Sequence, residues 1–197
     1  GSVISKEQPS ENDIPSLVAV PKAGQGAGFL GIRYAALETN ASPNFGEPFS
    51  VRGISLGEGI GVDEVQRRQS LLKKLDRRFS ELEKNDQLLE GLDKFGDQAY
   101  SMITSARARE AFDISREPES FSKQFGEESF GQSCMLALRL VESGVRLVSV
   151  QLGGWDTHTD NFSKLKDNNL PKLDAGLSGL LTGLEQRGLL ETTAVFV

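Results

Sequence analysis

The end of the chain reads as two strands flanking one long helix, and this pattern constrains the fold most. Residues 145–152 are rich in β-branched side chains and end at two glycines, which is typical of a strand. Leucines recur at helical spacing over residues 169–187, and residues 192–197 are again β-like. The eight-residue strand would span about 26 Å and the helix about 27 Å. These matching lengths predict a β-helix-β unit with parallel strands and a right-handed crossover.

Glycine and cysteine positions refine this expectation. Gly176, Gly179 and Gly183 lie beside the leucine stripe of the predicted helix. Each glycine in a helix interior costs about 1 kcal/mol, so three of them predict close approach to a sheet or to another helix. Cys134 lies on the apolar face of an earlier predicted helix, and we expect it to be a small buried side chain.

Three regions follow one another along the 197 residues. Residues 1–62 are rich in Gly, Pro, Ser and Asn, so we expect a mostly irregular segment packed on the body, with short β-like runs at 16–20 and 49–51. Residues 63–127 show the periodicity of helices. Residues 128–197 contain the β-helix-β unit. The fold class that this order predicts is α/β with parallel strands, as a partial three-layer α/β/α domain plus a helical region.

Two local signals concern element ends within these regions. Ser129 and Gln132 have the spacing of a capping box, which predicts a helix capped by Ser129. The chain stops at Val197, inside the predicted second strand. Because a buried parallel strand at a free end leaves its neighbours incomplete, we expect this chain to be a fragment of a longer protein.

Composition excludes several classes of site. With 22 basic and 28 acidic residues the formal net charge is −6, which disfavours nucleic acid as a partner. No apolar stretch approaches the ~18 to 20 residues that span a bilayer, so we expect no membrane span. The single histidine and single cysteine exclude two-histidine metal motifs and multi-thiolate zinc sites.

The loop after the first predicted strand carries the most chemistry. Asp156 and His158 follow Gly153 and Gly154, at the carboxyl end of a parallel strand, where open α/β sheets place their ligands. A carboxylate oxygen and an imidazole nitrogen are both zinc ligands, and a catalytic zinc normally has three protein ligands. Asp160 is a candidate third ligand, or the remaining ligands come from outside this chain.

Other interpretations of the same residues stay open at this stage. Asp156 could cap the following turn while His158 hydrogen-bonds a loop carbonyl, and Thr157 or Thr159 could in principle serve as a nucleophile. Residues 26–31 fit the pattern G-x-G-x-x-G, which would bind a dinucleotide only if it closed a strand and opened a helix.

Residues 130–150, followed by Gly153-Gly-Trp-Asp-Thr-His158 and by Asp160 and Asn161, resemble the bacterial domain-of-unknown-function 1501 family. Residues 28–31 and 108–113 also resemble sequences of this family. That family is itself similar to the alkaline phosphatase and sulfatase superfamily of metal-dependent hydrolases.

The resemblance implies that Asp156 and His158 hold one divalent metal ion, most simply zinc. Asp160, Asn161 and Trp155 would support these ligands or contact the substrate, a small phosphate or sulfate ester. It further implies export to the bacterial periplasm, with the nucleophile and the remaining ligands outside this chain, so that the fragment itself is inactive. The alternative is a degenerate family member that acts as a non-catalytic binding or scaffold domain of the cell envelope, with the helical region as its contact surface.

Overall fold

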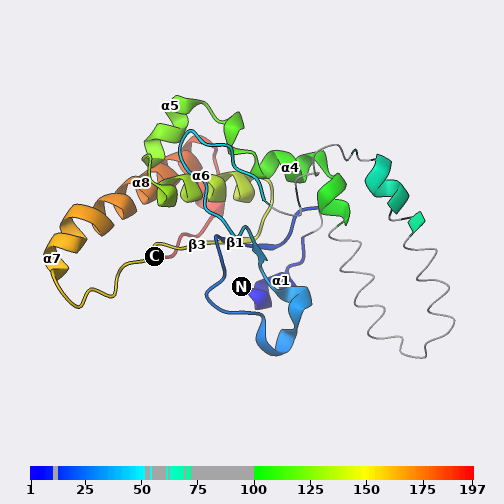
Figure 1. The fold of residues 1–197 in the computed structure, drawn as a ribbon, viewed down its shortest axis with the longest axis horizontal. Coiled ribbons are helices and arrows are strands. Elements are labelled where there is room, and N and C mark those ends of the chain that lie inside the picture. The colour runs from blue at the N-terminus through cyan, green and yellow to red at the C-terminus, as the bar shows by residue number, and fades with distance from the viewer. Residues whose placement is uncertain (11–12, 52–53, 55–60, 62, 69, 72–99) are drawn as a thin grey trace.

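The computed structural model describes residues 1–10, 13–51, 54, 61, 63–68, 70–71 and 100–197. Within these ranges three parallel strands form a sheet in the order β2-β1-β3 (Figure 1). The strands are β1 (Leu17–Val20), β2 (Leu37–Glu38) and β3 (Leu147–Val150). Val18 of β1 pairs with Leu37 on one side and with Val148 on the other. The prediction of an α/β fold with parallel strands is confirmed, whereas the three-layer arrangement remains a prediction.

The central strand comes from the region predicted to be mostly irregular. β1 corresponds to the β-like run at 16–20, and Val18, Ala19 and Val20 are completely buried. A strand that is covered on both faces is a continuous apolar run without alternation, and four residues are too few to show a period. The second β-like run, at 49–51, forms no strand, although Val51 is buried.

Helices supply most of the remaining structure. α4, α6 and α8 gather on one side of the sheet, and α1 lies on the other side (Figure 1). No helix in the described ranges is long and apolar enough to cross a membrane. The helices are α1 (Ser2–Glu7), α4 (Ala106–Phe112), α5 (Glu119–Ser122), α6 (Ser129–Glu142), α7 (Asn161–Lys164) and α8 (Leu170–Gln186), with 3-10 turns at Gly28–Leu30, Ile32–Tyr34, Ile114–Arg116, Lys123–Phe125 and Leu190–Thr192, and a π-turn at Leu165–Asn169.

Part of the predicted helical region can be compared with the structure. Residues 63–68, 70–71 and 100–104 are helical, in agreement with the periodicity of the sequence. The remainder of the two helices predicted between 63 and 104 lies outside the described residues.

The core lies where α6 packs between the sheet and α8. Glycines of α8 allow this contact: a Cβ on Gly176 would lie 2.7 Å from the Phe130 ring, and one on Gly183 would lie 2.5 Å from Leu138. Cys134 of α6 is 3% exposed and faces this contact. The predictions of close approach along the glycine stripe and of a buried cysteine are therefore confirmed.

The prediction that Ser129 caps α6 is wrong. Ser129 is the first residue of α6 and Glu128 is its N-cap, without a side-chain capping bond. The predicted capping partner Gln132 is buried instead and donates to the carbonyls of Ser122 and Gly126, because the preceding 3-10 turn brings these acceptors beneath the helix.

The predicted second strand of the β-helix-β unit is not formed. Leu190–Thr192 make a 3-10 turn, and residues 193–197 pair with no strand. Only Val195 of this segment packs on the core, while Phe196 and Val197 are 89% and 88% exposed. β-propensity measures how well side chains fit a half-buried pleated surface, so a β-like composition does not by itself produce a ladder.

Candidate functional site

The loops that follow β1 and β3 meet at the carboxyl edge of the sheet. A Cβ on Gly24 would lie 3.9 Å from the Gln151 side-chain amide, so the two loops are neighbours. The chain connects β1 to β2 on one side, while β3 pairs with β1 on the other. Ligands of open α/β sheets bind where the strand order diverges in this way. The candidate site therefore lies on the loops after β1 and β3.

The glycine-rich pattern at residues 26–31 belongs to the first of these loops. It forms the 3-10 turns Gly28–Leu30 and Ile32–Tyr34, which end at Ala35 without opening a longer helix. A dinucleotide site needs the backbone N–H groups of a helix N-terminus directed at the pyrophosphate. The strand-to-helix context that this motif requires is therefore not formed at residues 26–31.

Asp156 and His158 lie together on the second loop. His158 Nδ1 is 2.9 Å from Asp156 Oδ1, and the side chains are 81% and 89% exposed respectively. The structure thus places the predicted carboxylate and imidazole in direct contact on the surface of the loop. The alternative in which Asp156 caps the next turn is not observed, because Asp160 is the residue that precedes α7.

Local hydrogen bonds shape this loop. The Trp155 indole Nε1 donates to the Leu152 carbonyl at 2.9 Å, and the Thr157 N–H donates to the Trp155 carbonyl at 3.0 Å. The Thr157 hydroxyl donates to the side-chain carbonyl of Asn161, the first residue of α7. Trp155 and Asn161 therefore stabilise the loop on either side of Asp156 through hydrogen bonds to Leu152 and Thr157.

The remaining candidates lie apart from the pair. Asp160 adopts a left-handed backbone with φ 52°, and its carbonyl accepts the Lys164 N–H at 2.9 Å. The Thr159 hydroxyl accepts a hydrogen bond from the Lys164 ammonium at 3.3 Å, and the Thr157 hydroxyl donates to Asn161, so among the described residues neither hydroxyl is hydrogen-bonded to a general base. In the part of the chain that the structure describes, no group of three or more His, Cys, Asp or Glu side chains could hold a metal ion. Asp156 and His158 offer the oxygen and nitrogen donor types that zinc accepts, and among the described residues no third such side chain joins them.

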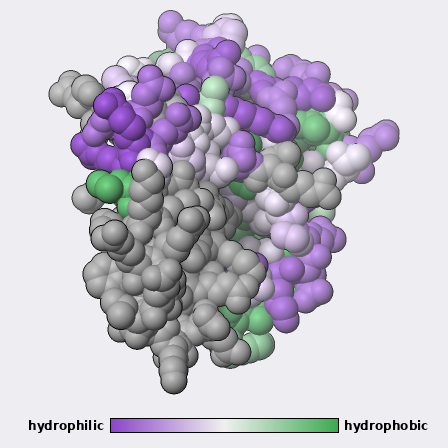
Figure 2. Space-filling model, turned by 90° about the vertical axis from the view of Figure 1, so that its right-hand side faces the viewer, coloured by the Kyte–Doolittle hydropathy of each residue, from purple (hydrophilic) through white to green (hydrophobic). Residues whose placement is uncertain are grey.

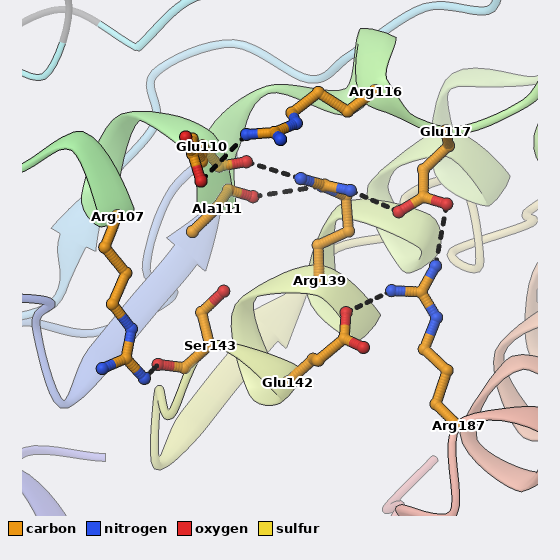
Figure 3. A pocket seen from close by; sticks show the side chains of 9 residues that line it. All are labelled: Arg107, Glu110, Ala111, Arg116, Glu117, Arg139, Glu142, Ser143 and Arg187. Atoms are coloured by element: carbon orange, nitrogen blue, oxygen red, sulfur yellow. Dashed lines mark hydrogen bonds and ion pairs between the residues drawn. The ribbon is translucent and has the colours of Figure 1, made fainter.

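A second polar cluster lies on the helical side of the sheet and was not predicted from the sequence. It lines a cavity of about 400 Å³ (Figure 3). Glu117, whose side chain is 9% exposed, pairs with both Arg139 of α6 and Arg187 after α8. Arg187 also pairs with Glu142. Arg139 also donates to the carbonyls of Glu110 and Ala111 in α4. These groups are far apart in sequence, and no local spacing signals that they meet.

The electrostatics of this cluster keep its members charged. Burial alone would raise the pKa of Glu117, but hydrogen bonds from Arg187 and Arg139 outweigh burial and lower it. Burial would likewise lower the pKa of Arg187, whereas hydrogen bonds and charge from Glu117 and Glu142 raise it. Because each charge already has partners, we assign the cluster a structural role in joining α4, α6 and the end of α8.

Figure 2 shows the hydropathy of the described side chains on one face of the molecule. The described side chains there are mainly hydrophilic, and apolar ones form small separate patches. Monomeric proteins commonly carry such patches without a function.

Comparison with known proteins gives one match. No curated protein and no solved structure matches the sequence. The family model described as "Protein of unknown function (DUF1501)" matches residues 1–197, which is the whole chain. The resemblance carried by residues 130–161 is thereby confirmed, and the chain belongs to the DUF1501 family.

Proposed function

We propose that this chain contributes Asp156 and His158 to a divalent metal site, occupied by zinc, in a hydrolase of phosphate or sulfate esters. The single observation that carries the proposal is the 2.9 Å approach of His158 Nδ1 to Asp156 Oδ1 beyond the carboxyl end of β3. The similarity of the family to alkaline phosphatases and sulfatases supports the reaction class and is part of the proposal.

The exposure of both side chains supports this role. A buried carboxylate–imidazole pair would be explained by packing, whereas an exposed one contributes little to stability, typically 0 to 1 kcal/mol. Side chains that are 81% and 89% exposed can release their mutual contact and accept an ion without disturbing the core. A bound divalent metal lowers the pKa of a coordinated nucleophile and neutralises developing charge on an ester.

In this proposal the chain's own residues bind and orient. His158 presents a neutral ring nitrogen, because only the deprotonated imidazole is a ligand. Asp156 supplies an anionic oxygen beside it. A third ligand and the nucleophile come from parts of the protein beyond the described residues.

Zinc competition against a chromophoric chelator tests the proposal on the natural protein that contains this chain, because that protein also carries the remaining ligands. We expect Asp156→Ala and His158→Ala each to lower zinc affinity at least tenfold. Asp174→Ala is the matched control, because it removes an exposed carboxylate on α8. Equal affinity of all four proteins would overturn the metal site.

A second arm tests the reaction class. The natural protein that contains this chain should hydrolyse p-nitrophenyl phosphate or p-nitrophenyl sulfate, and both loop substitutions should abolish turnover. Metal binding without hydrolysis of either ester would instead favour the non-catalytic binding role.

A further inference from the structure

A buried amide lies beneath the loop that carries Asp156 and His158. The Asn169 side chain is 2% exposed, and its Nδ2 donates to the Gly154 carbonyl at 2.8 Å. Its Oδ1 accepts from Asn168 Nδ2 at 2.7 Å. A buried polar group with its hydrogen bonds satisfied specifies one arrangement, because any other arrangement leaves it unpaired in a low dielectric.

The backbone around Asn169 is unusual in a way that brings this side chain inward. Leu165–Asn169 form a π-turn between α7 and α8, and the Leu170 N–H donates to the Leu165 carbonyl five residues back. Pro171 follows directly; in an α-helix its ring would clash with the carbonyl four residues before it. The wider turn avoids this clash, and it leaves Asn168 exposed and Asn169 buried. Such π-turns occur frequently at functional sites.

Asn169 is the connection between this loop and the interior. Residues 151–160 are exposed or half-buried, and among the described residues Asn169 is the buried side chain that hydrogen-bonds to them. Its acceptor belongs to Gly154, two residues before Asp156. Gly154 has a φ of +85°, which L side chains rarely adopt, and a Cβ there would lie 3.5 Å from the Asn169 amide.

We infer that Asn169 is the positioning residue of the Asp156–His158 pair. Its hydrogen bond to the Gly154 carbonyl fixes the position of the loop that carries the pair beyond β3. This inference rests on the proposed metal site for its purpose. Asn169 touches no metal ligand and acts through the backbone between Gly154 and Asp156. Partners that hydrogen-bond a metal ligand directly typically change metal affinity 10- to 100-fold when removed, and we expect the lower end of this range for Asn169.

The first test measures the loop itself, without metal. Backbone ¹⁵N relaxation of residues 153–158 should give order parameters near 0.85 in the wild-type chain and below about 0.6 in Asn169→Ser. Asp167→Ser is the matched control, because Asp167 is exposed on the same π-turn and its loss leaves both hydrogen bonds of Asn169 in place. A merely structural asparagine would affect the helix and leave the loop order parameters unchanged.

Gly154→Ala tests the same link from the solvent side. The substitution forces a strained backbone at the exposed end of the bond and leaves the core untouched, so it remains informative if Asn169→Ser fails to fold. Gly153→Ala is its matched control, because a Cβ there meets nothing within 4 Å and the backbone is not left-handed. We expect loosening of the loop in the first variant and none in the second.

The second test is zinc titration of the natural protein that contains this chain, as wild type and with the same four substitutions. Asn169→Ser and Gly154→Ala should bind zinc at least tenfold more weakly than the wild type, and the two controls should stay within about twofold of it. A loosened loop with unchanged zinc affinity would overturn the positioning role while the metal site stands. A wild-type protein that binds no zinc would refute the proposed function and the inference with it, and unchanged order parameters in both variants would refute the inference alone.

Discussion

Replacement of Glu117 by Gln tests the account of the charged cluster most sharply. The substitution keeps the shape of the side chain and removes its charge. Arg139 and Arg187, whose side chains are 12% and 18% exposed, then face a neutral amide (Figure 3). Breaking a buried ion pair by removing one partner costs about 3 to 5 kcal/mol, because a charge is left uncompensated away from water.

The expected cost is smaller here, for two structural reasons. Arg187 keeps its contact with Glu142, and Arg139 keeps the carbonyls of Glu110 and Ala111. The Gln amide oxygen can also still accept one hydrogen bond. We therefore expect Glu117→Gln to lower the free energy of unfolding by about 2 kcal/mol, which corresponds to a fall of about 4 to 8 °C in melting temperature for a chain of this length.

Urea denaturation followed by circular dichroism measures this change. Glu119→Gln is the control, because it breaks only the exposed ion pair with Lys123 and should leave the free energy of unfolding unchanged. A double-mutant cycle with Arg139→Met should give a coupling energy of about 1 to 2 kcal/mol. A loss below about 0.5 kcal/mol for Glu117→Gln, typical of surface sites, would refute the reasoning.

Three further predictions follow from the same structure. The stabilisation by Glu117 should be complete above its ordinary pKa of 4.5 and lost as pH falls through its lowered pKa in the folded state, so the wild type and Glu117→Gln should converge in stability in strong acid. Gly179→Ala should lower the free energy of unfolding by about 1 to 2 kcal/mol despite its gain in helix propensity, because the new Cβ would lie 2.8 Å from the backbone of Phe125. Urea denaturation measures this loss, and an unchanged free energy of unfolding would show that the Phe125 backbone can shift. Cys134 should react with a disulfide reagent at pH 8 only after unfolding, because burial raises the pKa of its thiol to about 12; fast labelling of the native chain would contradict this packing.

Local patterns predicted the elements whose determinants are close together in the chain. α6 and α8 were found because apolar residues recur at helical spacing, and the glycine stripe of α8 correctly indicated a close neighbour. Asp156 and His158 were singled out because they follow a predicted strand and are two positions apart. Their approach to one another is visible in the structure, whereas their metal remains a prediction.

Long-range contacts decided what the sequence could not show. Residues 16–20 and 192–197 have similar β-like composition, yet only the first pairs within the described residues, because β1 lies between two neighbours that complete its hydrogen bonds. Gln132 has the sequence spacing of a capping partner, but its side chain donates to the carbonyls of Ser122 and Gly126, which flank the 3-10 turn before α6.

The sequence by itself determined the fold class, the main helices and the chemistry offered by the loop after β3. The tertiary structure alone decided that β1 is the central strand, that Glu117 joins two arginines, and that Asn169 holds the loop. The physical reason is the same in each case. Periodicity records how a side chain faces its own helix or strand, whereas ladder pairing, charge compensation and buried hydrogen bonds depend on partners that only folding brings within about 3 Å.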